Sequence, residues 1–120
     1  MSKKIIVIDD SLTARRLLAQ HLKGHTLLEA SNGLEAIELL DQNTDTSIVF
    51  VDINMPWMDG LEFLKKIRGE EKYKNVPVCI LTTENGIESL EEAKKLGADA
   101  FIVKPASKEQ VESILANLSK

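Results

Sequence analysis

Short apolar runs alternate with helix-like stripes along the whole chain, and this alternation limits the possible folds more than any other feature. The apolar runs cover residues 5–8, 27–28, 48–51, 78–81 and 101–103. Four of them are continuous and largely β-branched, which is typical of strands that are covered on both faces. The run at 27–28 lies in a more mixed segment, so we expect it at an edge of the sheet.

Each run is followed by apolar residues that repeat at i, i+3, i+4 and i+7, the spacing of one face of a helix. These stripes cover residues 14–22, 33–40, 60–67, 90–96 and 111–118, of which 90–96 is the weakest. Gly97 can end this fourth helix. Capping-box spacing marks three helix starts: Asn32 with Glu35, Asn85 with Glu88, and Ser107 with Gln110.

Five strand–helix units in this order predict an α/β fold, a five-stranded parallel sheet flanked by five helices. Right-handed crossovers leave few topologies. The order 2-1-3-4-5 suits a weak second strand at one edge. The 120 residues, of which 43% are hydrophobic and 28% charged, fit a single globular domain over 1–120.

Charge and composition exclude several classes of protein. The net charge of −4 and the lack of a dense Lys/Arg stripe argue against nucleic acid as a direct partner. The polar start of the chain is too short for a signal peptide or a membrane span. The single Cys79 fits a reducing compartment. We therefore expect a soluble, cytoplasmic monomer without membrane contact.

Polar residues follow four of the five predicted strands. The first run ends in Asp9 and Asp10, the third in Asp52, the fourth in Thr82 and the fifth in Lys104. The carboxyl ends of parallel strands share one edge, and open α/β folds bind their ligands at that edge. We therefore expect three carboxylates, a hydroxyl and an ammonium group to meet in one place.

Each of these residues alone has a structural explanation, such as a helix cap or a turn. Together they predict a chemical site. Three neighbouring carboxylates repel one another unless one is protonated or a cation joins them, and oxygen ligands with open positions suit Mg²⁺. A carboxylate can accept a phosphoryl group as an aspartyl-phosphate. Lys104 and Thr82 could then bind phosphoryl oxygens, since phosphoryl transfer needs mainly positioning and charge neutralisation.

These residues resemble the receiver domains of response regulators in two-component signalling. The similarity rests on the stretches 7–11 and 51–60, on Thr82, and on Lys104-Pro105, in order and across essentially the whole chain. It implies a flavodoxin-like receiver fold with Asp52 as phosphoacceptor. It also implies a cis peptide bond before Pro105 and contact of Lys104 with the phosphoryl group.

The resemblance further implies how Mg²⁺ is bound. Asp10 and Asp52 would bind it through their side chains, Asn54 through its backbone carbonyl, and Asp9 largely through water. Asn54 is also a position that tunes phosphoryl loss in the family, together with Glu84. This Asn and Glu pair is similar to that of chemotaxis regulators, although a metal-loop residue and a helix-start acid explain the pair equally well.

The resemblance implies a phosphohistidine on a histidine kinase or a phosphotransfer domain as phosphodonor. His21 and His25 of this chain are interpreted as structural. The output would be control of an unknown protein target through the fourth helix, fifth strand and fifth helix. Thr82 and Phe101 would act as switch residues, with a fixed core position of Phe101 as the alternative. Trp57 could be exposed near the site or packed on its loop.

The sequence is also compatible with several other functions. The chain could be a stand-alone receiver, a phosphorelay intermediate or a piece of a longer regulator. An Asp-nucleophile phosphatase resembling the haloacid dehalogenase group is possible, but it usually has a second acid where this chain has Asn54. A flavin-binding module would need a hydroxyl- and glycine-rich loop instead of Asp9 and Asp10. A phosphorylation-independent scaffold would not need the full acidic and lysine set.

Overall fold

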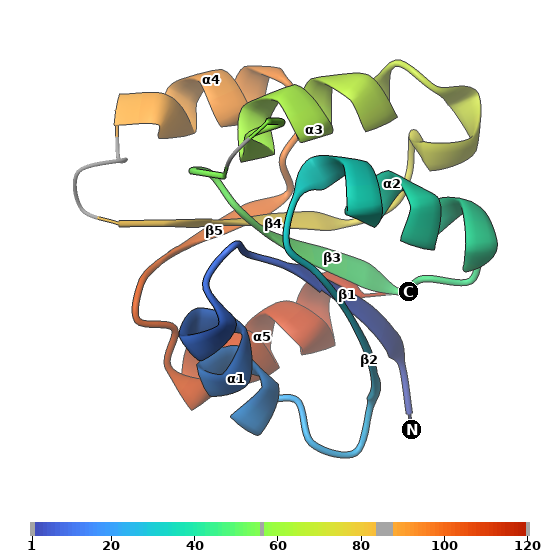
Figure 1. Ribbon diagram of the computed structural model, residues 1–120. Coiled ribbons are helices and arrows are strands. Elements are labelled where there is room, and N and C mark those ends of the chain that lie inside the picture. The colour runs from blue at the N-terminus through green and yellow to red at the C-terminus, as the bar shows by residue number, and fades with distance from the viewer. Residues whose placement is uncertain (1, 56, 84–87, 120) are drawn as a thin grey trace.

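The computed structural model describes residues 2–55, 57–83 and 88–119. One parallel sheet with the order β2-β1-β3-β4-β5 forms its centre (Figure 1). This confirms the predicted fold class and strand order, with β2 at an edge. The strands are β1 (Lys4–Ile8), β2 (Thr26–Ala30), β3 (Ile48–Asp52), β4 (Val78–Thr82) and β5 (Ala100–Val103).

Five helices cover the sheet. The helices α2, α3 and α4 lie on one face, and α1 and α5 lie on the other (Figure 1). Their bounds are α1 (Leu12–Gln20), α2 (Gly33–Gln42), α3 (Gly60–Arg68), α4 (Leu90–Lys95) and α5 (Lys108–Leu118). A short 3-10 helix, η1 (Glu71–Tyr73), follows α3 and was not expected from the sequence. Within the described residues, no helix combines the length and apolar character that a membrane span requires.

The strands form two separate cores because their side chains alternate between the two faces of the sheet. Ile6 and Val51 belong to the core beneath α2, α3 and α4, whereas Val7 and Phe50 belong to the core beneath α1 and α5. All residues of β3 and β4 are buried, as expected of central strands between two helix layers.

Local sequence signals fix most helix starts. The predicted capping box of Ser107 with Gln110 is complete. At α2, Asn32 accepts from the Glu35 amide, but the Glu35 carboxylate accepts from the amide of Ser31 instead of closing the box. A complete box at α3, Asp59 with Glu62, was not predicted. The expected cap at Asn85 lies outside the described residues.

Two glycines are required by the backbone. Gly97 ends α4 with a φ of +101°, a left-handed conformation that side chains disfavour. Gly60 begins α3 close to the end of β3, where an added Cβ would lie 2.5 Å from the backbone oxygen of Asp52. The missing side chain of Gly60 therefore lets α3 start directly beside the carboxyl end of the central strand.

Candidate functional site

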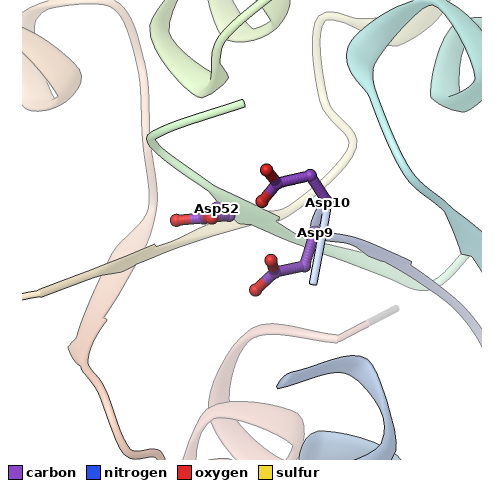
Figure 2. A group of neighbouring side chains, drawn as sticks. All are labelled: Asp9, Asp10 and Asp52. Atoms are coloured by element: carbon purple, nitrogen blue, oxygen red, sulfur yellow. The ribbon is translucent and has the colours of Figure 1, made fainter. Parts of the chain in front are cut away.

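The three aspartates meet at the carboxyl edge of the sheet, as the sequence predicted. Asp52 is the last residue of β3, and Asp9 and Asp10 directly follow β1 (Figure 2). Each offers a carboxylate oxygen, and these oxygens all lie within 4.8 Å of one another. The Asp9 amide donates to the Ala30 carbonyl at 3.0 Å, which holds this junction against the end of β2.

Lys104, directly after β5, completes the cluster. Its ammonium nitrogen lies 2.7 Å from Asp9 Oδ2 and 3.4 Å from Asp52 Oδ2. Its backbone amide donates to the Thr82 carbonyl at 2.7 Å, so that the ends of β4 and β5 stay in register. The peptide bond to Pro105 is cis, which confirms that expectation. One lysine thus partly neutralises two carboxylates that come from different strands.

The three aspartates differ in how far they are exposed to solvent. Asp9 and Asp52 are 1% and 5% exposed, whereas Asp10 is exposed. Asp9 is also fully bonded, because its Oδ1 accepts from the Ser11 amide at 2.9 Å and its Oδ2 accepts from Lys104. Asp52 has only long contacts, at 3.4 Å from the Asn54 amide and 3.4 Å from Lys104. Asp52 is therefore the less strongly hydrogen-bonded of the two buried carboxylates.

The electrostatics follow from this geometry. Burial, and after it the negative charge of Asp9, raises the pKa of Asp52 to about 6, although Lys104 and the Asn54 amide act in the opposite direction. Burial disfavours the charge of Lys104, but its hydrogen bond to Asp9 and the charge of Asp52 outweigh that effect and raise its pKa. A second cation at the cluster would relieve the remaining repulsion.

The donor set fits a hard divalent cation. Clustered carboxylate oxygens with space for water are its preferred protein ligands. A shallow hollow of about 460 Å³ lies beside them, lined by Asp10, Asn54, Met55 and Asp59. The acidic triad is typical of the metal site of receivers, which is also where the sequence placed it.

The two candidate switch residues occupy different environments. Thr82 is fully buried, and its hydroxyl donates to the Thr83 carbonyl at 3.1 Å. Phe101 is 42% exposed, with the Lys94 ammonium 5.3 Å from its ring centroid. The alternative of a fixed core position for Phe101 is therefore wrong, since Ile102 fills the core at this strand instead. Glu84 lies outside the described residues.

One residue near the site, Arg15, was not identified from the sequence, and the position of another, Trp57, was left open. Arg15 of α1 donates to the Asp9 carbonyl and, at 3.0 Å, to Glu29 of β2. Its only sequence signal is its position in the first turns of the helix that follows Asp9 and Asp10. Trp57, left undecided between an exposed and a packed position, is 81% exposed. As expected, His25 is structural, because its Nδ1 accepts from the Lys3 amide.

A doubly wound parallel sheet with three clustered carboxylates at its switch point is the arrangement expected of a receiver-type signalling domain. Residues 5–116 match the family described as response regulator receiver domain. The chain belongs to this family. It is a CheY-like receiver, a phosphorylation-dependent switch and a signalling protein rather than an ordinary enzyme, and its acidic pocket of Asp9, Asp10 and Asp52 is consistent with a phosphoacceptor site.

Individual proteins show how closely the chain follows the family. It is 43% identical over 119 residues to a chemotaxis protein CheY homolog of Campylobacter jejuni, which covers 93% of this chain and 92% of that protein. It is 38% identical over 122 residues to the sensor histidine kinase CheAY of Helicobacter pylori, covering 92% of this chain and 14% of the kinase. The solved structure of Vibrio cholerae chemotaxis protein CheY4 superimposes with a TM-score of 0.87 at 32% identity, covering 98% of this chain and 99% of that one.

Proposed function

We propose that Asp52 accepts a phosphoryl group from the phosphohistidine of a histidine kinase or a histidine phosphotransfer domain. The observation that supports this choice is the contrast within the acidic cluster. Asp52 is buried and central but has only long contacts of 3.4 Å, whereas both oxygens of Asp9 are engaged and Asp10 is exposed. Neither oxygen of Asp52 is held by a short hydrogen bond, so one can attack phosphorus while the other stays near a cation.

The cation in this proposal is Mg²⁺, held by the side chains of Asp10 and Asp52 and the backbone carbonyl of Asn54, with Asp9 acting largely through water. When bound, Mg²⁺ would neutralise charge on the transferring phosphoryl group. Lys104 lies 3.4 Å from Asp52 and can shift from Asp52 to a phosphoryl oxygen with a small movement. Transfer breaks the phosphorus–nitrogen bond of the donor, forms a phosphorus–oxygen bond to Asp52, and leaves the histidine to be reprotonated from solvent.

Phosphorylation then acts on Thr82 and Phe101. The Thr82 hydroxyl, which donates to the Thr83 carbonyl in this structure, would turn to a phosphoryl oxygen. The partly exposed ring of Phe101 would move into the space released beside β4, and the surface of α4, β5 and α5 would change. The phosphoryl group and its cation bias this equilibrium because they interact with only one of the two arrangements.

The biological setting is a further part of the proposal. The names of the similar proteins favour chemotaxis. We propose a cytoplasmic monomer with one phosphoacceptor domain over residues 1–120, which controls a protein target and does not contact nucleic acid or membrane directly. Asn54 would contribute to the lifetime of the phosphoryl group.

Labelling with acetyl phosphate tests the assignment of the acceptor. We expect wild type to be labelled only with Mg²⁺ present, through a bond that is stable in acid and labile in base. Asp52→Asn should not be labelled, whereas Arg16→Ala, a change on the outer face of α1, should be labelled like wild type. Equal labelling of Asp52→Asn and wild type would show that the acceptor is another residue.

A further inference from the structure

Trp57 is presented to solvent in an unusual way. At 81%, it is the most exposed of the large hydrophobic side chains that the structure describes. Its backbone has a φ of +63°, a left-handed conformation that is costly for a bulky residue and that glycine adopts freely. A solvent-exposed indole gains no stability from the core, so packing within the described residues does not explain why Trp57 occupies this strained position.

The position of Trp57 relates it to the acidic site. It lies in the loop from β3 to α3, which follows Asp52 and also contributes Asn54 to the hollow beside the acids. The next residue, Met58, packs against the start of α2, since a Cβ on Gly33 would lie 2.8 Å from its Cγ and its Sδ. Leu34, adjacent to Gly33, is 54% exposed. Trp57 and Leu34 are therefore exposed apolar residues, each next in sequence to one member of this packing contact, and Trp57 shares its loop with residues that line the hollow.

The partner that would cover these two residues follows from access to Asp52. The acceptor is 5% exposed. The hollow beside it is lined by Asp10, Asn54, Met55 and Asp59. These residues belong to the loops that follow β1 and β3 at the carboxyl edge of the sheet (Figure 1). A histidine side chain is short, so a protein that brings phosphohistidine to Asp52 has to place its own surface against these loops. Exposed apolar side chains on or beside these loops would be covered while a protein donor is in place.

We propose that Trp57 and Leu34 form a docking surface for the protein that carries the phosphohistidine, with the Trp57 indole covered by apolar side chains of that partner during transfer. This inference rests on the proposed function and adds the recognition of the donor to it. Buried aromatic residues at interface centres contribute more affinity than other residue types. The docking surface therefore selects a protein donor, whereas a small phosphodonor reaches Asp52 without contacting the indole.

Two phosphodonors separate docking from chemistry. The small donor is acetyl phosphate, and the protein donor is autophosphorylated CheAY of Helicobacter pylori without the segment that resembles this chain. For Trp57→Gly we expect transfer from the kinase to be about tenfold slower or more, as for loss of an aromatic anchor. Labelling by acetyl phosphate should be unchanged. Trp57→Phe should restore most of the kinase-dependent rate, and Leu34→Ser should reduce it.

The glycine variant controls for misfolding, because glycine tolerates the φ of +63° and the lost side chain is exposed. Its stability should match or exceed that of wild type. If Trp57→Gly and wild type react equally fast with the kinase while acetyl phosphate still labels Asp52, the docking surface is wrong and the proposed function stands. If acetyl phosphate does not label Asp52 in wild type, the proposed function fails, and the docking surface fails with it.

Trp57 also reports its own burial, since it is the only tryptophan of the chain. With 5-fluorotryptophan incorporated, the single ¹⁹F resonance should shift and lose its solvent sensitivity when the kinase fragment is added. The same shift on raising the concentration of the protein alone would assign the surface to a second copy of the chain and overturn the proposal. An unchanged resonance in the presence of a kinase that transfers phosphate would also overturn it.

Discussion

The two edges of the sheet differ in how their charged side chains are paired. At the carboxyl edge, three carboxylates lie close together, Lys104 pairs with only two of them, Asp9 and Asp52, and Asp52 is left with contacts of 3.4 Å. At the amino edge, the Arg68 guanidinium donates to the Gly97 carbonyl, the Tyr73 carbonyl and the Asp99 carboxylate, at 3.1, 3.0 and 3.0 Å.

This difference indicates what each edge does. Arg68 connects α3, η1 and the turn before β5, and Asp99 also accepts from the Val78 amide at 2.9 Å. Arg68 and Asp99 each have partners of opposite sign or backbone groups, so this arrangement stabilises the fold. The like charges at the carboxyl edge destabilise the fold until a ligand neutralises them. The same sheet thus separates stability from reactivity at its two ends.

The largest effect on stability is expected for Arg68→Ala. Loss of three hydrogen bonds from a charged, mostly buried group should lower the free energy of unfolding by about 3 kcal/mol. Urea denaturation measures this loss, with Lys66→Ala on the same helix as an exposed control. Labelling by acetyl phosphate should keep its wild-type rate at temperatures where the variant is folded. A variant that unfolds like wild type would show that the amino edge is not the stabilising one.

The next effect is stabilisation by Mg²⁺ at the opposite edge. A ligand at one hundred times its Kd stabilises a protein by about 2.7 kcal/mol, because it binds only the folded state. We expect the Tm of wild type to rise with added Mg²⁺ and that of Asp10→Asn to rise much less. Calcium-free buffers and matched ionic strength are needed for the comparison. An equal rise in both proteins would place the cation elsewhere.

Removing the charge of Asp52 should also stabilise the metal-free protein. The folded pKa of about 6 lies above the ordinary value of 3.8, so the stability due to this carboxyl is fully present below 3.8 and is lost as the pH rises through about 6. We expect Asp52→Asn to be more stable than wild type by about 2.5 kcal/mol at pH 7, since the folded pKa lies about two units above the ordinary value and each unit corresponds to 1.36 kcal/mol. The pKa of about 6 already includes the attraction of Lys104.

The measurement is a pH series of urea denaturation in the presence of a chelator. The two stability curves should converge towards pH 4, where the wild-type carboxyl is protonated. A constant difference across the series would mean that burial and the neighbouring Asp9 do not disfavour the charged form of Asp52.

The smallest effect concerns an exception at the amino edge. The Tyr73 hydroxyl is buried and has no hydrogen-bond partner among the described residues. A buried hydroxyl without a partner costs free energy, so Tyr73→Phe should be neutral or should stabilise the protein by up to about 1 kcal/mol. Tyr73→Leu should destabilise it through the loss of packing. A clear loss of stability in the phenylalanine variant would reveal a bonded water at this hydroxyl.

The sequence determined the local features of this protein. Periodicity indicated the five strands and the five α-helices, though not the short η1, because a two-sided sheet and a one-sided helix require different apolar spacings. The strand ends located Asp9, Asp10, Asp52, Thr82 and Lys104, because parallel strands finish at a common edge. Asn32 and Ser107 were recognisable as caps, because a cap is a contact over three residues.

Tertiary structure decided the features that depend on distant segments. The network of Arg68 joins residues up to 31 positions apart, and nothing in the local pattern distinguishes this arginine from a solvated one. The exposure of Phe101 and Trp57 depends on which neighbouring elements cover each residue. The pKa of Asp52 depends on burial by both helix layers and on Asp9 from another strand. Periodicity reports the face on which a residue lies, whereas its partners and solvent exposure are fixed only when the chain has folded.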